Sequence, residues 1–257
     1  MSYESLIYEK TGHIATVTLN RPESLNAWGG RMSAEVLQVF DEMAADDDVR
    51  VTILTGAGRG FCSGQNVKDP NAHVGDPVIE RMMQSEGRPL FPADYPKPLI
   101  GAVNGPAYGA GLNLVLCCDF VLASTAARFC FPMSRLGIFP LFPGAQTLAV
   151  YVGKVRAAEM ALMARSIDGE EAARWGLANR CVAPEALMDE ARTWAAELAR
   201  MSPVSLRKIK DDLRESYASH FNRQLNQLRA WMAQTTEDSR EGHNAWREKR
   251  APIFTGR

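Results

Sequence analysis

Two glycine-bounded corners carry the residues whose types and spacing could do chemistry. In one of them, Gly109, Ala110 and Gly111 open an apolar stretch that runs to Cys117. If this stretch is a helix, its first backbone N–H groups have no partner within the helix and lie at the positive end of its dipole. They are therefore donors for an oxygen that carries or develops negative charge.

The second corner lies earlier in the chain, where residues 60–66 read Gly-Phe-Cys-Ser-Gly-Gln-Asn. A β-branched apolar run over 51–55 precedes it and predicts a strand. A glycine after a strand is most often only a turn. Two such corners that converge on one oxygen would form an oxyanion hole, in which backbone N–H groups stabilise a charge that develops during a reaction.

The composition and the net charge argue against several classes of function. The chain has 257 residues, is 46% hydrophobic and has a formal net charge of −1, so nothing points to nucleic acid or to an anionic membrane surface. The first residues do not form a signal peptide and no apolar run reaches about 18 residues, so we expect a cytoplasmic protein without a membrane contact. Five cysteines without a Cys-x-x-Cys pair and four scattered histidines predict neither a disulfide framework nor a metal site.

Regular apolar patterns predict the elements that must hold the two corners. Period-two alternation and β-branched residues predict strands over 5–9, 14–19, 51–55, 99–103, 120–124 and 127–131. Apolar residues at helical spacing predict helices over 32–45, 112–117, 145–152, 155–164 and 170–175. Strands and helices that alternate in this way predict an α/β fold.

The rest of the chain follows other patterns. Between 67 and 98 six prolines confine any helix to 78–85, which is typical of a segment that covers a site. Beyond Pro184 a charged amphipathic pattern predicts helices over 185–200, 203–218, 221–235 and 239–247. We therefore expect a core over 1–190 and a C-terminal helical region over 191–257 that forms subunit contacts.

Several short motifs follow one another in a defined order: Leu19-Asn20-Arg21-Pro22, Leu25-Asn26-Ala27, the corner at 60–66, Val103-Asn104-Gly105, Gly109-Ala110-Gly111, Leu136-Gly137-Ile138 and Lys249-Arg250-Ala251-Pro252. Their order and spacing resemble those of the enoyl-CoA hydratase/isomerase family, the crotonase superfamily. Cys62-Ser63-Gly64-Gln65, together with Ser239-Arg240-Glu241-Gly242, most resembles the branch that holds the epoxyphenylacetyl-CoA isomerases.

The resemblance implies a crotonase-type spiral of ββα units that assembles as a homotrimer or homohexamer and takes an acyl-CoA thioester as its substrate. CoA is part of that substrate, so no separate cofactor is implied. The backbone N–H groups of Gln65 and Ala110 would form the oxyanion hole, and backbone donors tolerate most side chains. CoA would lie along Leu25, Ala27, Ser63, Gly64, Gln65, Asn66, Val67, Lys68 and Gly109, and Lys249 would reach one of its phosphates.

Three positions depart from the family's pattern. The family's hydratases carry two catalytic glutamates, at the positions of Asn113 and Met133, and several isomerases carry an aspartate at the position of Leu141. An amide forms hydrogen bonds without shuttling a proton, and the other two side chains only pack. Two-glutamate hydration is therefore not expected. Glu80 and Glu86, in the proline-rich segment, are the candidate substitutes for the missing carboxylates.

Other functions stay open at this point. The same fold could hold an acyl-CoA without turning it over, or could migrate a double bond or hydrolyse the thioester with a base from the proline-rich segment. Residues 60–64 also match a Gly-x-Cys-x-Gly nucleophile elbow around Cys62, but five residues separate it from the expected strand. Gly56-Ala57-Gly58 has its third glycine too early for a dinucleotide fingerprint. Apolar Phe139, Leu141 and Phe142, with Met133, predict a hydrophobic pocket for an alkyl or aromatic acyl group.

Overall fold

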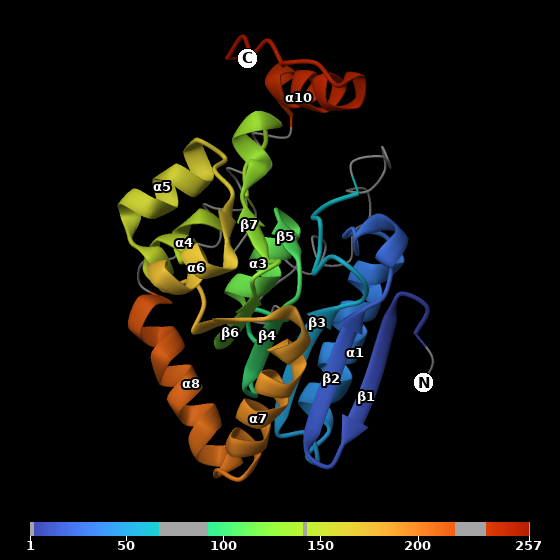
Figure 1. Ribbon diagram of the computed structural model, residues 1–257, viewed down its shortest axis with the longest axis vertical. Helices are drawn as coiled ribbons and strands as arrows, with labels where there is room; N and C mark the ends of the chain where they lie inside the picture. Colours follow the sequence, from blue (N-terminus) through green and yellow to red (C-terminus); the bar gives the residue numbers. More distant parts are fainter. Residues whose placement is uncertain (1–2, 67–91, 141–142, 219–234, 257) are drawn as a thin grey trace.

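A six-stranded sheet runs through the computed structural model, which describes residues 3–66, 92–140, 143–218 and 235–256. The strand order is β1-β2-β3-β4-β6-β9, and all neighbours beyond the β1–β2 hairpin are parallel (Figure 1). The strands are β1 Leu6–Thr11, β2 Ile14–Leu19, β3 Val51–Gly56, β4 Leu99–Val103, β6 Phe120–Ser124 and β9 Arg180–Val182. A smaller sheet has the order β5-β7-β8, with β5 Pro106–Tyr108, β7 Arg128–Cys130 and β8 Ile167–Asp168.

Helices cover both faces of the large sheet, as parallel strands require. The longer ones are α1 Arg31–Ala45, α4 Gly144–Val152, α5 Lys154–Leu162, α7 Leu187–Ala199, α8 Pro203–Ala218 and α10 Glu237–Glu248. The shorter α-helices are α3 Ala110–Leu116 and α6 Gly169–Trp175, and the 3-10 helices are η1 Pro22–Ser24, η2 Pro132–Arg135 and η3 Pro184–Ala186. No helix in the described ranges combines the length and apolar character that crossing a bilayer needs.

The core forms where these helices meet the strands. Figure 1 shows α7 in front of the sheet and α1 behind it. On the α7 side, Leu187, Ala191 and Ala195 are buried against strand residues that include Val51 and Ile100. On the other side, the apolar stripe of α1 packs into the larger buried cluster that also holds the helix α3. The central strand β3 is therefore buried on both faces.

Most predicted elements are confirmed, including the α/β class and the helical C-terminal region. Strands β5, β8 and β9 could not be predicted from the sequence, because strands of two or three residues are too short to show an alternating pattern. The helices expected over 78–85 and 221–235 lie outside the described residues.

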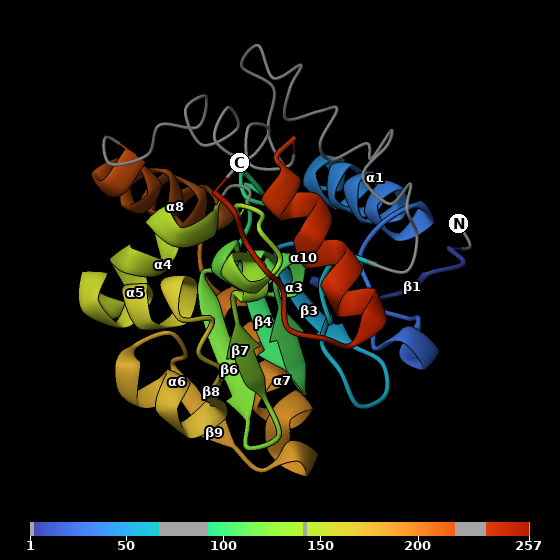
Figure 2. The same cartoon turned by 90° about the horizontal axis from the view of Figure 1, so that it is seen from above.

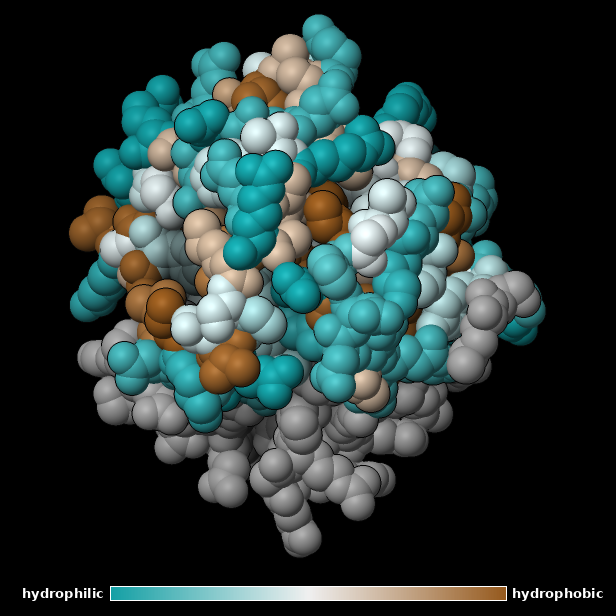
Figure 3. All heavy atoms as spheres, turned by 90° about the horizontal axis from the view of Figure 1, so that it is seen from below, coloured by the Kyte–Doolittle hydropathy of each residue, from teal (hydrophilic) through white to brown (hydrophobic). Residues whose placement is uncertain are grey.

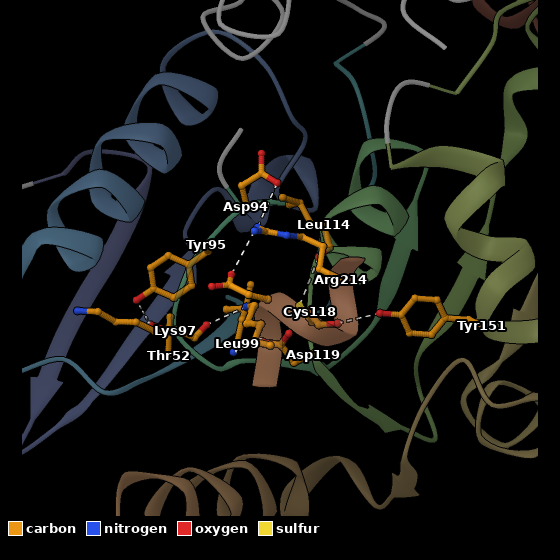
Figure 4. Close-up of polar contacts among 12 residues, drawn as sticks. Thr52, Asp94, Tyr95, Lys97, Leu99, Leu114, Cys118, Asp119, Tyr151 and Arg214 are labelled. Carbon is orange, nitrogen blue, oxygen red and sulfur yellow. Dashed lines mark hydrogen bonds and ion pairs between the residues drawn. The ribbon is translucent and has the colours of Figure 1, made fainter. Parts of the chain in front are cut away.

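Helix α8 is fastened to the sheet by charged side chains. Lys210 Nζ lies 2.6 Å from Asp119 Oδ2, and the same oxygen accepts a hydrogen bond of 2.8 Å from the Leu99 backbone N–H. Figure 4 shows Arg214 reaching from α8 to Asp94, at 3.4 Å. The Asp119 carboxylate therefore connects α8 to the start of β4.

Helix α10 packs on the loop that follows η2. A Cβ on Gly242 would lie 2.2 Å from the Leu136 carbonyl oxygen, and one on Gly137 would lie 2.4 Å from the Asp238 carbonyl oxygen. Only glycines allow two backbones to approach so closely. Seen from above in Figure 2, α10 accordingly crosses the top of the molecule in front of α3.

Candidate functional site

The two glycine corners expected from the sequence lie in direct contact. A Cβ on Gly64 would lie 2.6 Å from the Tyr108 carbonyl oxygen and 3.6 Å from the Ala110 backbone nitrogen. The Cα of Gly64 is itself 3.9 Å from where a Cβ on Gly109 would stand. Gly64 and Gly109 have φ values of +89° and +53°, which residues with a side chain rarely adopt. Both corners therefore depend on glycine for conformation and for space.

Backbone hydrogen bonds hold the first corner along β5. The N–H groups of Phe61 and Cys62 both donate to the Pro106 carbonyl oxygen, at 3.1 and 2.9 Å, and the Tyr108 N–H donates to the Cys62 carbonyl oxygen at 2.9 Å. A Cβ on Gly111 would lie only 2.1 Å from that same Cys62 oxygen. The backbone at the start of α3 thus packs directly against the backbone of residues 60–64.

The pairing of Gln65 with Trp28 sets the direction of the Gln65 amide. The Trp28 N–H donates to the Gly64 carbonyl oxygen at 2.7 Å, and the Asn66 N–H donates to the Trp28 carbonyl oxygen at 2.9 Å. In such a parallel bridge, the residue between the two bonded neighbours directs its own N–H away from the partner. Ala110 is the first residue of α3, so no carbonyl within the helix accepts its N–H.

The structure brings the expected CoA-binding residues of the first corner together with an N-terminal loop. The Ser63 N–H donates to the Leu25 carbonyl oxygen at 2.9 Å, and Leu25 has a φ of +52°. The expected residues Leu25, Ala27, Ser63, Gly64, Gln65 and Asn66 therefore belong to two adjacent segments, 25–28 and 63–66, which form a strip beside Gly109. Val67 and Lys68 lie outside the described residues. Lys249 is exposed at the end of α10, and no hydrogen bond or ion pair joins it to either corner in the described part of the chain.

Two asparagines that the sequence analysis used only as motif residues position the loop between β3 and the first corner. Asn26 is fully buried; its Oδ1 accepts from the Arg21 N–H at 2.7 Å, and its Nδ2 donates to the carbonyl oxygens of Ala57 and Gly60 at 3.0 and 2.8 Å. From the other side, Asn104 Nδ2 donates to the Gly58 carbonyl oxygen at 3.0 Å. Asn26 also has a φ of +57°, a conformation that asparagine tolerates better than most residues with a side chain, but no pattern in the sequence indicates this role.

The structure describes two of the three positions at which the resemblance implies a carboxylate, those of Asn113 and Met133. Asn113 is half-buried, and its Oδ1 accepts a hydrogen bond of 3.2 Å from the Gly144 backbone N–H. Met133 is buried, and its Cε lies 3.4 Å from where a Cβ on Gly109 would stand. An amide and a thioether therefore occupy the wall beside the second corner. Leu141, Glu80 and Glu86 lie outside the described residues.

The cysteine of the first corner is not a nucleophile. Cys62 is completely buried, and burial raises the pKa of its thiol to about 12. Because the thiolate is the reactive form, this thiol is inert at neutral pH. A loop rather than a strand also precedes it, so the nucleophile-elbow interpretation is wrong. In the part of the chain that the structure describes, no three His, Cys, Asp or Glu side chains form a metal site.

Comparisons with known proteins agree with the motifs. The model of the enoyl-CoA hydratase/isomerase family matches residues 9–257. The chain is 37% identical to the 1,2-epoxyphenylacetyl-CoA isomerase of Escherichia coli K12 over 252 residues, which cover 95% of each chain. It is 38% identical to a probable enoyl-CoA hydratase of Rhodobacter capsulatus over the whole of both chains. A crystal structure of an enoyl-CoA hydratase/isomerase from Pseudoalteromonas atlantica superposes with a TM-score of 0.86 at 26% identity, covering 98% of this chain and 100% of the other.

Proposed function

The chain belongs to the enoyl-CoA hydratase/isomerase family, and we propose that it stabilises the enolate of an acyl-CoA thioester with the backbone N–H groups of Gln65 and Ala110. The observation that carries this proposal is the contact between the two glycine corners, in which Gly64 approaches the Ala110 nitrogen. When an α-proton leaves, the negative charge gathers on the thioester oxygen. Preorganised donors act on that charge, and one such donor typically contributes about 3 kcal/mol.

The acid–base chemistry differs from that of a two-glutamate hydratase. Asn113 and Met133 cannot take or give a proton at neutral pH, so neither can activate water. We propose an isomerase-type reaction, in which a proton leaves one carbon of the enolate system and returns to another. Glu80 and Glu86 remain the candidate bases for that transfer.

The strip beside the first corner would hold CoA. Leu25, Ala27, Ser63, Gly64, Gln65 and Asn66 border it, and Val67, Lys68 and Gly109 complete the proposed set. The backbone N–H and C=O groups of these segments would be the hydrogen-bonding partners for the amides of pantetheine. We keep Lys249 as the proposed phosphate contact, contributed by a neighbouring subunit.

Exchange of substrate α-protons tests enolate formation without knowledge of the natural substrate. The protein is incubated with phenylacetyl-CoA or butyryl-CoA in D₂O, and deuterium uptake is followed by mass spectrometry. We expect uptake above the uncatalysed rate. Ala110→Pro removes one N–H at a helix position that accommodates proline, and should reduce the rate by at least about tenfold, while Ala110→Ser keeps the N–H and the rate. No exchange with any acyl-CoA that binds would reject enolate chemistry.

The second candidate function is an acyl-CoA-binding protein without turnover. The neutral side chains of Asn113 and Met133 favour this function. Both proposed backbone donors, Gln65 and Ala110, are present, whereas the two glutamates of the family's hydratases are replaced. Tight binding by calorimetry combined with absent α-proton exchange would select this function. Thioester hydrolysis is a third outcome of the same incubations, recognised by release of free CoA.

We also propose that the chain assembles as a homotrimer or homohexamer, with residues 191–257 in the subunit contacts. Large apolar side chains are exposed on α5 and α8, which lie on the same flank in Figures 1 and 2: Val155, Leu162, Val204 and Ile209. Figure 3 shows from below that apolar patches interrupt the polar surface. Exposed apolar patches mark interaction surfaces. Sedimentation should give an oligomer that Leu162→Glu with Val204→Glu dissociates; a monomeric wild type would reject the proposal.

A further inference from the structure

Asn113 stands one helical turn after the proposed donor Ala110. Residues three apart in a helix share a face, and the rise between them is about 4.5 Å. The backbone N–H of Asn113 is already used, because it donates to the Gly109 carbonyl oxygen at 3.0 Å. Only its side chain is therefore available to a ligand whose thioester oxygen lies at Ala110.

The hydrogen bond with Gly144 decides which end of this side chain faces a ligand. A backbone N–H can only donate, so the atom that lies 3.2 Å from the Gly144 nitrogen must be the amide oxygen. The two N–H bonds of Nδ2 point the other way. Within the described residues, no acceptor is hydrogen-bonded to Nδ2. Asn113 is thus a donor of fixed orientation.

The second corner also has an uncharged, apolar side chain beside it. Met133, on η2, lies against Gly109 with its thioether. A ligand at this corner would therefore meet the Asn113 amide and the Met133 thioether, neither of which carries a charge. A donor that is desolvated without an acceptor costs free energy, so this arrangement discriminates between acyl chains with and without an acceptor.

We propose that Asn113 is a specificity-determining residue that donates a hydrogen bond to a neutral oxygen on C3 or C4 of the acyl chain. The inference rests on the proposed function, because it places the thioester oxygen at Gln65 and Ala110. An oxygen on C3 or C4 lies a few ångströms from the thioester oxygen, which is comparable to the rise of about 4.5 Å between Ala110 and Asn113. The Asn113 amide donates a hydrogen bond to this oxygen and transfers no proton. The position at which the family's hydratases carry a catalytic glutamate would therefore serve substrate recognition in this chain.

Calorimetric titration of the full chain with three ligands tests the proposal: butyryl-CoA, 3-oxobutyryl-CoA and 4-oxopentanoyl-CoA. The carbonyl oxygens on C3 and C4 of the two oxo ligands can only accept hydrogen bonds. We expect one of the oxo ligands to bind the wild type about tenfold more tightly than butyryl-CoA. Asn113→Asp can still accept from Gly144, but its second oxygen is an acceptor, so this variant should lose the preference for the oxo ligand.

Circular dichroism reports whether each variant is folded, and Asn113→Leu serves as a second variant that lacks the donor. Equal affinities of the wild type for all three ligands would overturn this inference while leaving the proposed function intact. So would a preference that survives in both variants. If none of the acyl-CoA ligands bound the wild type, the proposed function would fail and the inference would fail with it.

Discussion

The backbone nitrogen of Ala110 lies 3.6 Å from the point where a Cβ on Gly64 would stand. These residues come from separate β-α connections, yet their backbones lie close together. The approach depends on the missing side chain, since the same Cβ would lie 2.6 Å from the Tyr108 carbonyl oxygen. The site is thus built from backbone geometry more than from side-chain chemistry.

Replacing Gly64 by alanine should separate the two corners. The new Cβ would collide with a backbone oxygen at a φ of +89°, so the loop must move. We expect α-proton exchange to fall by at least about tenfold, since a donor is displaced from the oxyanion. Gly12→Ala is the matched control, because Gly12 also has a positive φ of +57° but nothing within 4 Å of a Cβ. Unchanged exchange in Gly64→Ala would contradict the proposed geometry.

Asn26 should matter for stability because it joins two loops through buried hydrogen bonds. Asn26→Ala removes all three and leaves buried backbone groups unpaired, which we expect to lower the free energy of unfolding by about 2–4 kcal/mol. Asn26→Asp keeps the acceptor for the Arg21 N–H and loses the two donors, so it separates the contributions. Urea unfolding measures both variants. A loss below about 0.5 kcal/mol in Asn26→Ala would show that the loops hold without this residue.

The residues that formed the corners could be predicted from the sequence because glycine positions report backbone requirements directly. A Cβ on Gly64 or on Gly111 would lie 2.6 or 2.1 Å from a backbone oxygen. Gly109 is required for another reason, because its φ is positive and its nearest neighbour is the Met133 side chain. Strands such as β3 were predictable for a similar reason, since burial on both faces demands a continuous apolar run.

The hydrogen bond between Asn113 and Gly144 could not be predicted in this way. It joins residues 31 apart in the sequence, and an asparagine side chain is compatible with loop, cap and site positions alike. The same holds for Asn26, whose partners come from a loop beyond α1 and β3. Long-range polar contacts follow from the assembled fold and leave no periodic signal in the chain.

The buried thiol of Cys62 predicts a pH dependence of stability. Its pKa in the folded protein is about 12, above the ordinary value of 9.0, because burial disfavours the thiolate. The unfolded chain therefore loses this proton first as pH rises. The contribution of the protonated Cys62 thiol to the free energy of unfolding is fully present below pH 9 and is lost as pH rises from about 9 toward 12. The urea midpoint should fall more steeply between pH 8 and pH 10.5 in the wild type than in Cys62→Ala; equal slopes would show that the thiol is not desolvated.

Restoring carboxylates should create hydration. We expect the wild type to add water to crotonyl-CoA slowly, and Asn113→Glu combined with Met133→Glu to do so at least about tenfold faster, since acid–base groups contribute about 10²–10⁴-fold. Each single variant should gain little, because hydration needs both an acid and a base. The loss of absorbance of the conjugated thioester measures the rate. Fast hydration by the wild type would show that other residues already supply the acid and the base.

Difference infrared spectroscopy of a bound thioester carbonyl tests the oxyanion hole most directly. Phenylacetyl-CoA labelled with ¹³C at the thioester carbonyl is added to the wild type, Ala110→Ser and Ala110→Pro. The account predicts that the carbonyl band moves to lower wavenumber in the wild type and in Ala110→Ser, and that Ala110→Pro, which lacks the N–H, loses most of this shift. A bound carbonyl that vibrates as it does in water, or an unchanged shift in Ala110→Pro, would contradict it.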